Sequence, residues 1–293
     1  MTEKQPSKQP SEWLRRLPWI GERVADRIER APIVPVIQLS GVIGQTGSAK
    51  RGLSLSALST PLDHAFRMGR VKAVALAINS PGGSPVQSAL IAKRIRALSD
   101  EKEIPVYAFC EDVAASGGYW LACAADEIYA DGASIVGSIG VVSASFGFPA
   151  LLDRIGVERR VHTAGDKKAM LDPFRPEDPK DVKHLKEIQK DLHEQFSAYV
   201  RERRAQRLSA NEKILFSGEF WTGRKALEMG VVDGIGDLRS VMREKLGENV
   251  RFRVMAQPRG WLQRKLGVER ASSLAHEVMT IFEERAIWAR YGL

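Results

Sequence analysis

The amino-acid sequence predicts an α/β fold built on a largely parallel sheet. Three apolar segments, at 33–39, 71–78 and 106–110, have the length and composition of buried strands. The second reads VKAVALAI, and such a nearly continuous apolar run is typical of a parallel strand covered on both faces. Segments with helical spacing separate these strands, and strand–helix alternation favours a parallel sheet with helices packed on it.

Local signals predict the elements between and after these strands. Thr60 is an N-cap candidate with Pro61 in the first helical position, which predicts a helix at 60–68. Gly230 is a typical glycine just past a helix end. The other expected elements are helices at 86–98, 119–125, 149–155, 181–208 and 223–229, strands at 127–130, 133–142 and 158–163, a loop at 164–179, and a final strand and turn at 231–234.

Composition divides the chain into three ranges. Residues 1–32 are expected to form a polar tail followed by an amphipathic helix. Residues 33–240 are expected to form the α/β domain. Residues 241–293 differ in character and are expected to form a C-terminal helical extension, with a second amphipathic helix and the tail IWARYGL at its end. We expect that tail to dock in or near the groove of the functional site.

Bulk composition narrows the class of protein. The 293 residues are 44% hydrophobic and 27% charged, which is ordinary for a soluble globular protein. The net charge of +8 is spread along the chain without a block of five like charges, so nucleic-acid binding is not expected. Cys110 and Cys123 lie in apolar surroundings and indicate buried, reduced thiols, which favours a cytoplasmic location. No metal site and no organic cofactor is expected.

The sequence contains no run of 18 apolar residues and no apolar core of a secretory signal, so neither a transmembrane segment nor a signal peptide is expected. The segment 11–30 places Trp13, Leu17 and Ile20 among several arginines in an amphipathic pattern. One interpretation is a helix docked on the domain or on a neighbouring subunit. The other is peripheral attachment to an anionic membrane surface, here the inner membrane.

A serine follows the strand at 106–110 on a turn of small residues, in the order Ala-Ser-Gly-Gly. At a strand-to-helix junction, the hydroxyl of Ser116 would project from the sheet beside free backbone N–H groups, which makes it a candidate nucleophile. A second glycine-rich exit, Ser-Pro-Gly-Gly-Ser, ends the strand at 71–78. The N–H groups of Gly83 and Gly117 could together hold a developing oxyanion.

The general base is harder to find in the residues themselves. None of the five histidines lies in a glycine-rich or acid-paired setting, so a Ser-His-Asp triad has no obvious members. A lysine can serve instead when burial keeps it neutral. Lys167 and Lys168 precede an apolar segment and are candidates, although an exposed loop position is the simpler interpretation of either.

These motifs resemble the signal peptide peptidase A family, which includes SohB-like proteins. The resemblance rests on S-P-G-G-S, A-S-G-G-Y-W-L-A and G-S-I-G-V-V, on F-S-A-Y-V with Arg203 and Arg204, and on T-G-R-K-A-L-E-M-G-V-V-D, all in the family's order over residues 33–238. It implies a Clp/crotonase-type ββα superhelix with N- and C-terminal helical extensions, and a serine endopeptidase with a Ser/Lys dyad.

The resemblance also implies a role for each matching residue. Ser116 matches the nucleophile, and Lys168 matches the general base of the short, single-domain members. Ser138 matches a serine that hydrogen-bonds this lysine. Gly83 matches an oxyanion-hole glycine, with Gly117 as the second donor. Extended apolar peptides such as signal-peptide remnants would be the substrates. The short members form rings in which neighbouring subunits share a site, so a homo-oligomer is expected.

Two other functions are compatible with the same residues. The fold also hosts acyl-CoA enzymes of the crotonase type, whose paired N–H groups hold a thioester enolate. A non-catalytic scaffold could bind membrane or peptide through the amphipathic ends of the chain. Labelling of Ser116 by a fluorophosphonate would discriminate the peptidase from both.

Overall fold

The computed structural model describes residues 31–44, 52–255 and 287–292. They form an eight-stranded sheet in the order β6-β5-β3-β2-β1-β8, with β4 paired to β3 and β7 to β4. All pairings are parallel except that between β5 and β6. The strands are β1 (Ile33–Ser40), β2 (Val74–Ser80), β3 (Val106–Ala115), β4 (Glu127–Ala130), β5 (Ile135–Gly137), β6 (Phe220–Thr222), β7 (Gly234–Ile235) and β8 (Arg251–Met255).

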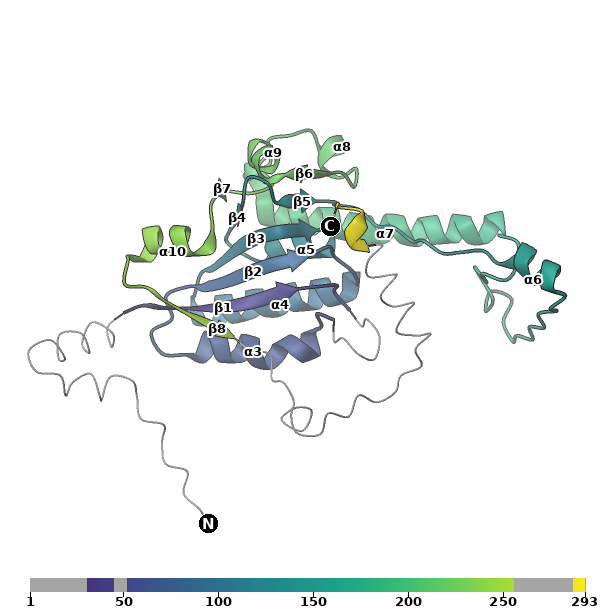
Figure 1. Cartoon of the computed structure of the whole chain (residues 1–293), viewed down its shortest axis with the longest axis horizontal. Coiled ribbons are helices and arrows are strands. Elements are labelled where there is room, and N and C mark those ends of the chain that lie inside the picture. Colours follow the sequence, from purple (N-terminus) through teal and green to yellow (C-terminus); the bar gives the residue numbers. More distant parts are fainter. Residues whose placement is uncertain (1–30, 45–51, 256–286, 293) are drawn as a thin grey trace, which may run out of the picture.

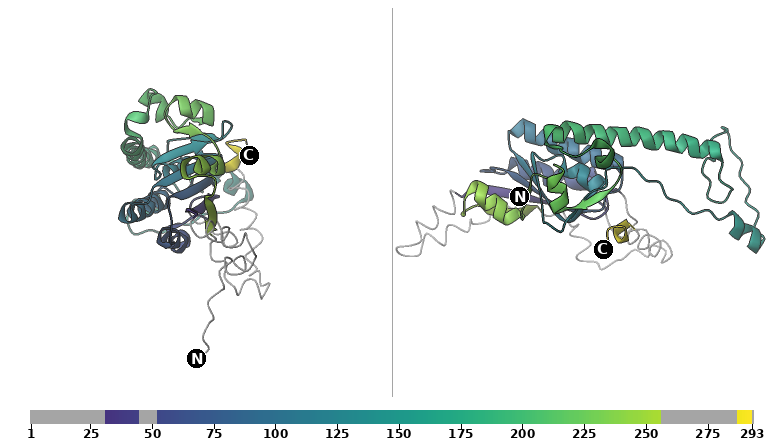
Figure 2. Two further views of the ribbon diagram at one scale, coloured as in Figure 1. Left: turned by 90° about the vertical axis from the view of Figure 1, so that its left-hand side faces the viewer. Right: turned by 90° about the horizontal axis from the view of Figure 1, so that it is seen from above.

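Helices cover both faces of the sheet, as the apolar strands require (Figure 1 and Figure 2). Leu76 and Ile78 of β2 lie in the core under α3, α4 and α5, whereas Ala75 and Ala77 face the side covered by α10. The helices are α3 (Leu55–Arg67), α4 (Pro85–Lys102), α5 (Gly117–Ala122), α6 (Pro149–Ile155), α7 (Pro179–Arg204), η1 (Ala205–Arg207), α8 (Glu212–Leu215), α9 (Gly223–Glu228) and α10 (Leu238–Leu246). The expected α/β class is confirmed.

The long helix α7 leaves the sheet and forms an arm with α6 (Figure 1 and Figure 2). Its buried residues, Phe196, Ser197, Val200 and Arg204, all lie in its C-terminal third. The apolar positions nearer its start, such as Val182 and Ile188, are half-buried or exposed. The apolar stripe of α7 therefore continues past the edge of the domain to which the helix is anchored.

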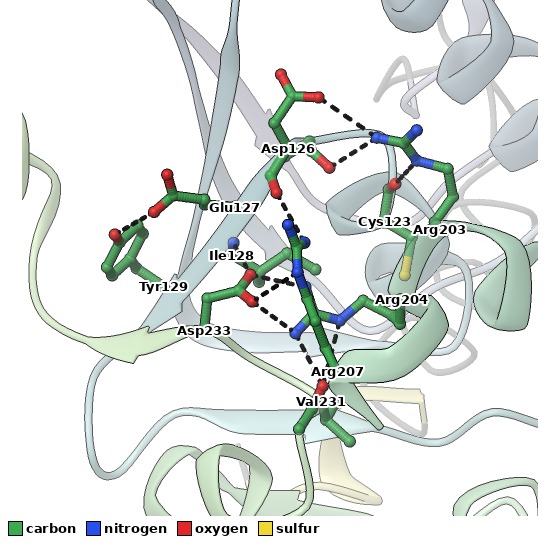
Figure 3. A network of polar contacts seen from close by, with 12 residues as sticks. Cys123, Asp126, Glu127, Ile128, Tyr129, Arg203, Arg204, Arg207, Val231 and Asp233 are labelled. Carbon is green, nitrogen blue, oxygen red and sulfur yellow. Dashed lines mark hydrogen bonds and ion pairs between the residues drawn. The ribbon is translucent and has the colours of Figure 1, made fainter. Parts of the chain in front are cut away.

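A network of arginines anchors α7 to the domain (Figure 3). The guanidinium of Arg204 is buried, and it pairs with Asp233 at 2.7 and 3.0 Å and with the Gly230 carbonyl at 2.8 Å. Arg203 donates to the carbonyls of Cys123 and Ala125 at the end of α5. Because the same short helix α5 begins directly after Ser116, these contacts tie the position of that serine to α7.

Several local predictions differ from the structure, and the final strand predicted at 231–234 is the short β7 at Gly234–Ile235. The helix predicted at 60–68 begins earlier, at Leu55 with Ser54 as its cap, so Pro61 lies inside it. The predicted strand at 133–142 is limited to β5, and β3 runs on to Ala115. No strand forms at 158–163, because that segment lies in the arm, away from any strand that could pair with it.

Strand β8 was not expected from the sequence. Its residues fall in the range 241–293 predicted as a helical extension, yet they pair with β1 from Ile33↔Arg251 to Ile37↔Met255. The boundaries at 32 and 240 otherwise stay predictions. The amphipathic helix at 11–30 and most of the second one lie outside the described residues.

Candidate active site

Ser116 lies on the sharp turn between β3 and α5. Its backbone angles are φ 52° and ψ −121°, a combination that costs a non-glycine residue about 1–3 kcal/mol. Its N–H donates to the Gly137 carbonyl at 2.8 Å, which holds the turn against β5. Although Ser116 occupies the N-cap position of α5, its side chain makes no capping hydrogen bond. The hydroxyl is therefore presented at the end of the sheet rather than used to stabilise the helix.

The glycines of the Ser-Pro-Gly-Gly-Ser loop touch this serine turn directly. Gly82 has φ +104°, and a Cβ there would lie 2.8 Å from the Cβ of Ser116 and 2.9 Å from the nitrogen of Gly117. Gly83 has φ +142°, and a Cβ there would collide with the carbonyl of Ile43. Only glycine fits either position, and the structure thus brings together the two glycine-rich exits found in the sequence.

Gly117 directly follows Ser116, and Gly82, the residue before Gly83, packs against the Ser116 turn. The N–H of Gly117 belongs to the first turn of α5, where backbone N–H groups have no partner inside the helix. Neighbouring bonds hold the other loop in place: Ile43 donates to the Gly82 carbonyl at 2.8 Å, and Ser84 donates to the Ile43 carbonyl at 2.8 Å. Among the described residues, the N–H of Gly83 donates to no backbone carbonyl.

Ser138 lies beside Ser116 through the pairing of β3 with β5, in which Ala115 is opposite Gly137. It is buried and has φ 53°, and its N–H donates to the Glu219 carbonyl at 2.6 Å. Like Ser116, it is held in a left-handed conformation that a serine rarely adopts. The structure therefore places Ser138 within the same site as Ser116.

Lys168 is not near Ser116 in a single chain. It is exposed in the segment between α6 and α7, and its neighbour Lys167 pairs with Asp181 at 3.2 Å in the first turn of α7. Trp120 lies one turn of α5 after Ser116, and Phe196 of α7 stacks on it. Phe196 therefore marks the part of α7 that is near Ser116. At about 1.5 Å per residue, roughly 22 Å of helix separates Asp181 from Phe196, and a lysine side chain cannot span that distance.

Other nucleophiles and bases are less well placed. Burial raises the pKa of Cys110 and of Cys123 to about 12, so neither thiol ionises readily. His64, His162 and His184 are exposed. In the described part of the chain, no histidine hydrogen-bonds to Ser116, and no group of three or more metal-binding side chains occurs.

One structural support of the site is not apparent from the sequence. The pairing of β2 with β3 shifts register between Ile78 and Ser80. There the Asn79 amide donates to Asp112 at 2.7 Å and accepts from the Val113 N–H at 3.3 Å. This bridge fixes the two glycine-rich exits relative to each other. Asn79 immediately precedes the glycine loop, but no residue near it in the sequence indicates that its side chain pairs with Asp112.

A serine on a strained strand-to-helix turn, packed against a glycine-rich loop, is typical of hydrolases that use a serine nucleophile. Residues 99–250 match the model of peptidase family S49. The chain belongs to this family, and its Clp/crotonase-type fold agrees with the expectation from the motifs.

Comparison with individual proteins gives relatives of several lengths. Proteins named Na(+)/H(+) antiporter NhaA from Brucella abortus and Brucella melitensis are each 50% identical over 291 residues, which is 94% of this chain but 39% of theirs. Serine protease SPPA of Arabidopsis thaliana is 32% identical over 183 residues, covering 62% of this chain and 27% of that protein. The chain thus spans about two fifths of the two Brucella proteins.

Among solved structures, a lysine-to-alanine mutant of the 1510-N membrane-bound stomatin-specific protease, in complex with a substrate peptide, has a TM-score of 0.49 at 16% identity. The match covers 86% of this chain and 98% of that one.

Among the described residues of this chain, no helix combines the length and apolar character needed to cross a membrane.

Proposed function

We propose that this chain is a serine endopeptidase in which Ser116 is the nucleophile and Lys168 the general base. The neutral amine of Lys168 takes the proton from Ser116 Oγ, which attacks the carbonyl carbon of a peptide bond. The N–H groups of Gly83 and Gly117 stabilise the resulting oxyanion. The amine product leaves with the proton, and water then hydrolyses the acyl-enzyme. Ser138 holds the lysine by a hydrogen bond to its amine.

The observation that carries this proposal is the geometry of Ser116 in a chain of peptidase family S49. The hydroxyl of Ser116 makes no capping bond to α5, and the glycine loop approaches the serine turn more closely than a loop with side chains could. The family favours peptide-bond hydrolysis over acyl-CoA chemistry, and the paired glycines favour catalysis over a scaffold. The substrates we propose are extended, apolar peptides such as signal-peptide remnants.

A second copy of the chain supplies the lysine. In one chain the arm carries Lys168 away from Ser116, so a complete dyad requires an arm from a neighbour. The arm also exposes large apolar side chains, among them Phe146 at 75%, Ile155 at 60% and Val157 at 51%. Exposed apolar groups gathered on one projecting segment mark an interaction surface. The assembly we propose is a homo-oligomeric ring with sites shared between neighbours.

The nucleophile is tested by labelling with a fluorophosphonate and mapping the adduct by mass spectrometry. Wild type should carry the adduct on Ser116, whereas Ser116→Ala should carry none and hydrolyse no peptide. An adduct that persists in Ser116→Ala would reject this serine. Lys168→Ala should also be inactive, and Lys167→Ala, which alters the adjacent exposed lysine, is the matched control and should stay active.

The shared site is tested by mixing two inactive variants, Ser116→Ala and Lys168→Ala, under conditions that exchange subunits. In a ring with random mixing, about a quarter of the interfaces join an intact Ser116 to an intact Lys168 from the neighbour. Activity should therefore return to about a quarter of the wild-type level. If each chain forms its own dyad, no mixture regains activity, because every chain lacks one member.

The reduced thiols support a cytoplasmic location, which we propose together with peripheral attachment through the basic amphipathic segment 11–30. Flotation of the full chain with vesicles of anionic or neutral lipid tests the attachment. Flotation with anionic vesicles alone is the expected result. Absence of flotation with either composition would leave the segment as a helix docked on protein.

A further inference from the structure

Strand β3 changes its partner in the middle of its length. Residues 107–110 pair with β4, and residues 113–115 pair with β5. In the described part of the chain, the two exposed residues between these halves, Glu111 and Asp112, pair with neither strand. The change of partner therefore coincides with an irregularity in β3, shortly before the strand leads into Ser116.

The same irregularity changes the register of β3 against β2. Ile78 is opposite Cys110, whereas Ser80 is opposite Ala114, so the step from 78 to 80 in β2 spans 110 to 114 in β3. Strand β3 thus has two extra residues across this interval, an irregularity of the β-bulge type. Because the surplus is even, the side chains before and after it keep their faces of the sheet. Cys110 and Ala114 accordingly both lie in the core under the helices.

This register decides which residue of the glycine loop faces the candidate nucleophile. Continued two residues beyond its last pair, the register sets Gly82 against Ser116. The close packing agrees with this alignment, since a Cβ on Gly82 would lie 2.8 Å from that of Ser116. Without the two extra residues in β3, Gly82 would lie opposite Ala114, two residues before the serine. The alignment of the glycine loop with Ser116 therefore depends on the irregular segment.

Asn79 joins the irregular segment to β2. Its side chain is half-buried, and its backbone carbonyl accepts from the Gly41 N–H at 2.9 Å on the side of β1. Toward β3 the side chain takes the place of a backbone pairing. The amide oxygen accepts from the Val113 N–H at 3.3 Å, and the amide nitrogen donates to the Asp112 carboxylate at 2.7 Å. The charged acceptor makes the second hydrogen bond the stronger one.

We propose that Asn79 and Asp112 are positioning residues, whose bridge fixes the register in which the glycine loop, with the Gly83 N–H, faces Ser116. This inference rests on the proposed peptidase function, since the nucleophile and the oxyanion donors that the bridge aligns belong to that function. Both residues act through the backbone that they join and not through contact with the substrate. A bridge of the same shape should therefore serve equally well, whichever of the two residues carries the carboxylate.

Loosening the bridge should lower kcat and leave KM nearly unchanged, because the oxyanion forms only in the transition state. Asn79→Ala removes both hydrogen bonds. It should slow both peptide hydrolysis and fluorophosphonate labelling of Ser116 about 10²-fold, the cost of a displacement of about 1 Å. Asp112→Ala leaves the contact with Val113 and should slow both about tenfold. Glu111→Ala alters the adjacent exposed carboxylate and is the matched control, with wild-type rates expected. Wild-type kcat and labelling in Asn79→Ala would overturn the positioning role.

Conservative variants separate the geometry of the bridge from its charge. Asp112→Asn keeps an acceptor for the Asn79 amide and should stay within about threefold of the wild-type kcat. Asn79→Asp sets two carboxylates against each other and should lower kcat about 10²-fold. The double variant Asn79→Asp/Asp112→Asn reverses the bridge and should recover most of that loss. A double variant no faster than Asn79→Asp, or Asp112→Asn as slow as Asp112→Ala, would overturn a role based on geometry.

The bridge can also be followed without catalysis. In full-length Ser116→Ala protein, hydrogen exchange over residues 111–118, measured by mass spectrometry, reports how firmly the serine turn is held. Adding Asn79→Ala should accelerate this exchange about tenfold, and adding Asn79→Asp/Asp112→Asn should leave it unchanged.

The two kinds of measurement separate this inference from the proposed function. If no protein is labelled or hydrolyses peptide, yet exchange follows the bridge, the peptidase proposal fails and the hold of the bridge on the serine turn stands. If wild type is active and the Asn79 and Asp112 variants match it in kcat and labelling, the peptidase proposal stands and the positioning role is rejected.

Discussion

Arg204 offers a direct test of how the arm is anchored. Its side chain is 1% exposed, and Asp233, its partner, is 17% exposed. Replacing Arg204 by alanine removes both donors from the Gly230 carbonyl and both from the Asp233 carboxylate. Among the described residues, Asp233 then keeps the Ile128 N–H at 2.7 Å and the more distant Arg207 at 3.5 Å.

The expected loss of stability follows from these contacts. Breaking a buried ion pair by removing one partner costs about 3–5 kcal/mol, because the remaining charge is left uncompensated. The Gly230 carbonyl adds to this as a half-buried acceptor that has lost its side-chain donors. Arg204→Lys keeps the charge but cannot reproduce the two parallel contacts with the carboxylate, so a loss of about 1–3 kcal/mol is expected.

The same helix provides the control. Arg201 also pairs with two carboxylates, Glu194 and Glu212, but its side chain is 38% exposed and those of its partners are more so. Arg201→Ala should therefore cost about 0–1 kcal/mol. Urea unfolding of the three variants at pH 7 gives the comparison, read from the midpoint at constant m. Equal losses for Arg204→Ala and Arg201→Ala would refute the reasoning that burial decides the energy.

Three further predictions concern the site and its surroundings. Gly82→Ala places a Cβ 2.8 Å from that of Ser116, which displaces the serine turn. Labelling of Ser116 by a fluorophosphonate should therefore slow by about 10²-fold. A wild-type labelling rate would show that the glycine loop can move away from the serine turn at no cost. Because burial raises the pKa of Cys110 and Cys123 to about 12, iodoacetamide at pH 8 should modify them only after unfolding, and fast modification of folded protein would contradict their burial. Hydrogen bonds from the side chain and backbone of Ser240 lower the pKa of Asp237 at the start of α10. The ionised carboxylate therefore stabilises the folded state above pH ~4, and this stabilisation is lost as the pH falls through the folded-state pKa. Asp237→Ala should cost about 1 kcal/mol of stability at pH 7 and progressively less below pH 4, which thermal unfolding at several pH values would measure.

The sequence predictions are correct where the residues that determine an element lie within that element. The segment 71–78 carries apolar residues for both faces of a strand, and the structure covers both faces, with Leu76 under the helices and Ala75 under α10. The turn at Ser116 and the glycine loop can be located from the sequence because runs of small residues directly after an apolar strand are typical of tight turns at the end of a sheet. By contrast, the segment at 158–163 has the composition of a strand but no neighbouring strand to pair with in the arm.

Ser116, Gly83 and Gly117 could be proposed from residue type and position along the chain, because a strand exit determines what its own backbone presents. The separation of Lys168 from Ser116, the place of β8 beside β1, the burial of Arg204 and the position of Tyr291 against Ser138 depend on residues far apart in the chain. Such contacts form only when the chain closes around a common core, and sequence spacing does not encode which distant segments meet there. The sequence by itself therefore determined the sheet and the chemistry at its strand ends, and tertiary packing decided which groups reach that chemistry.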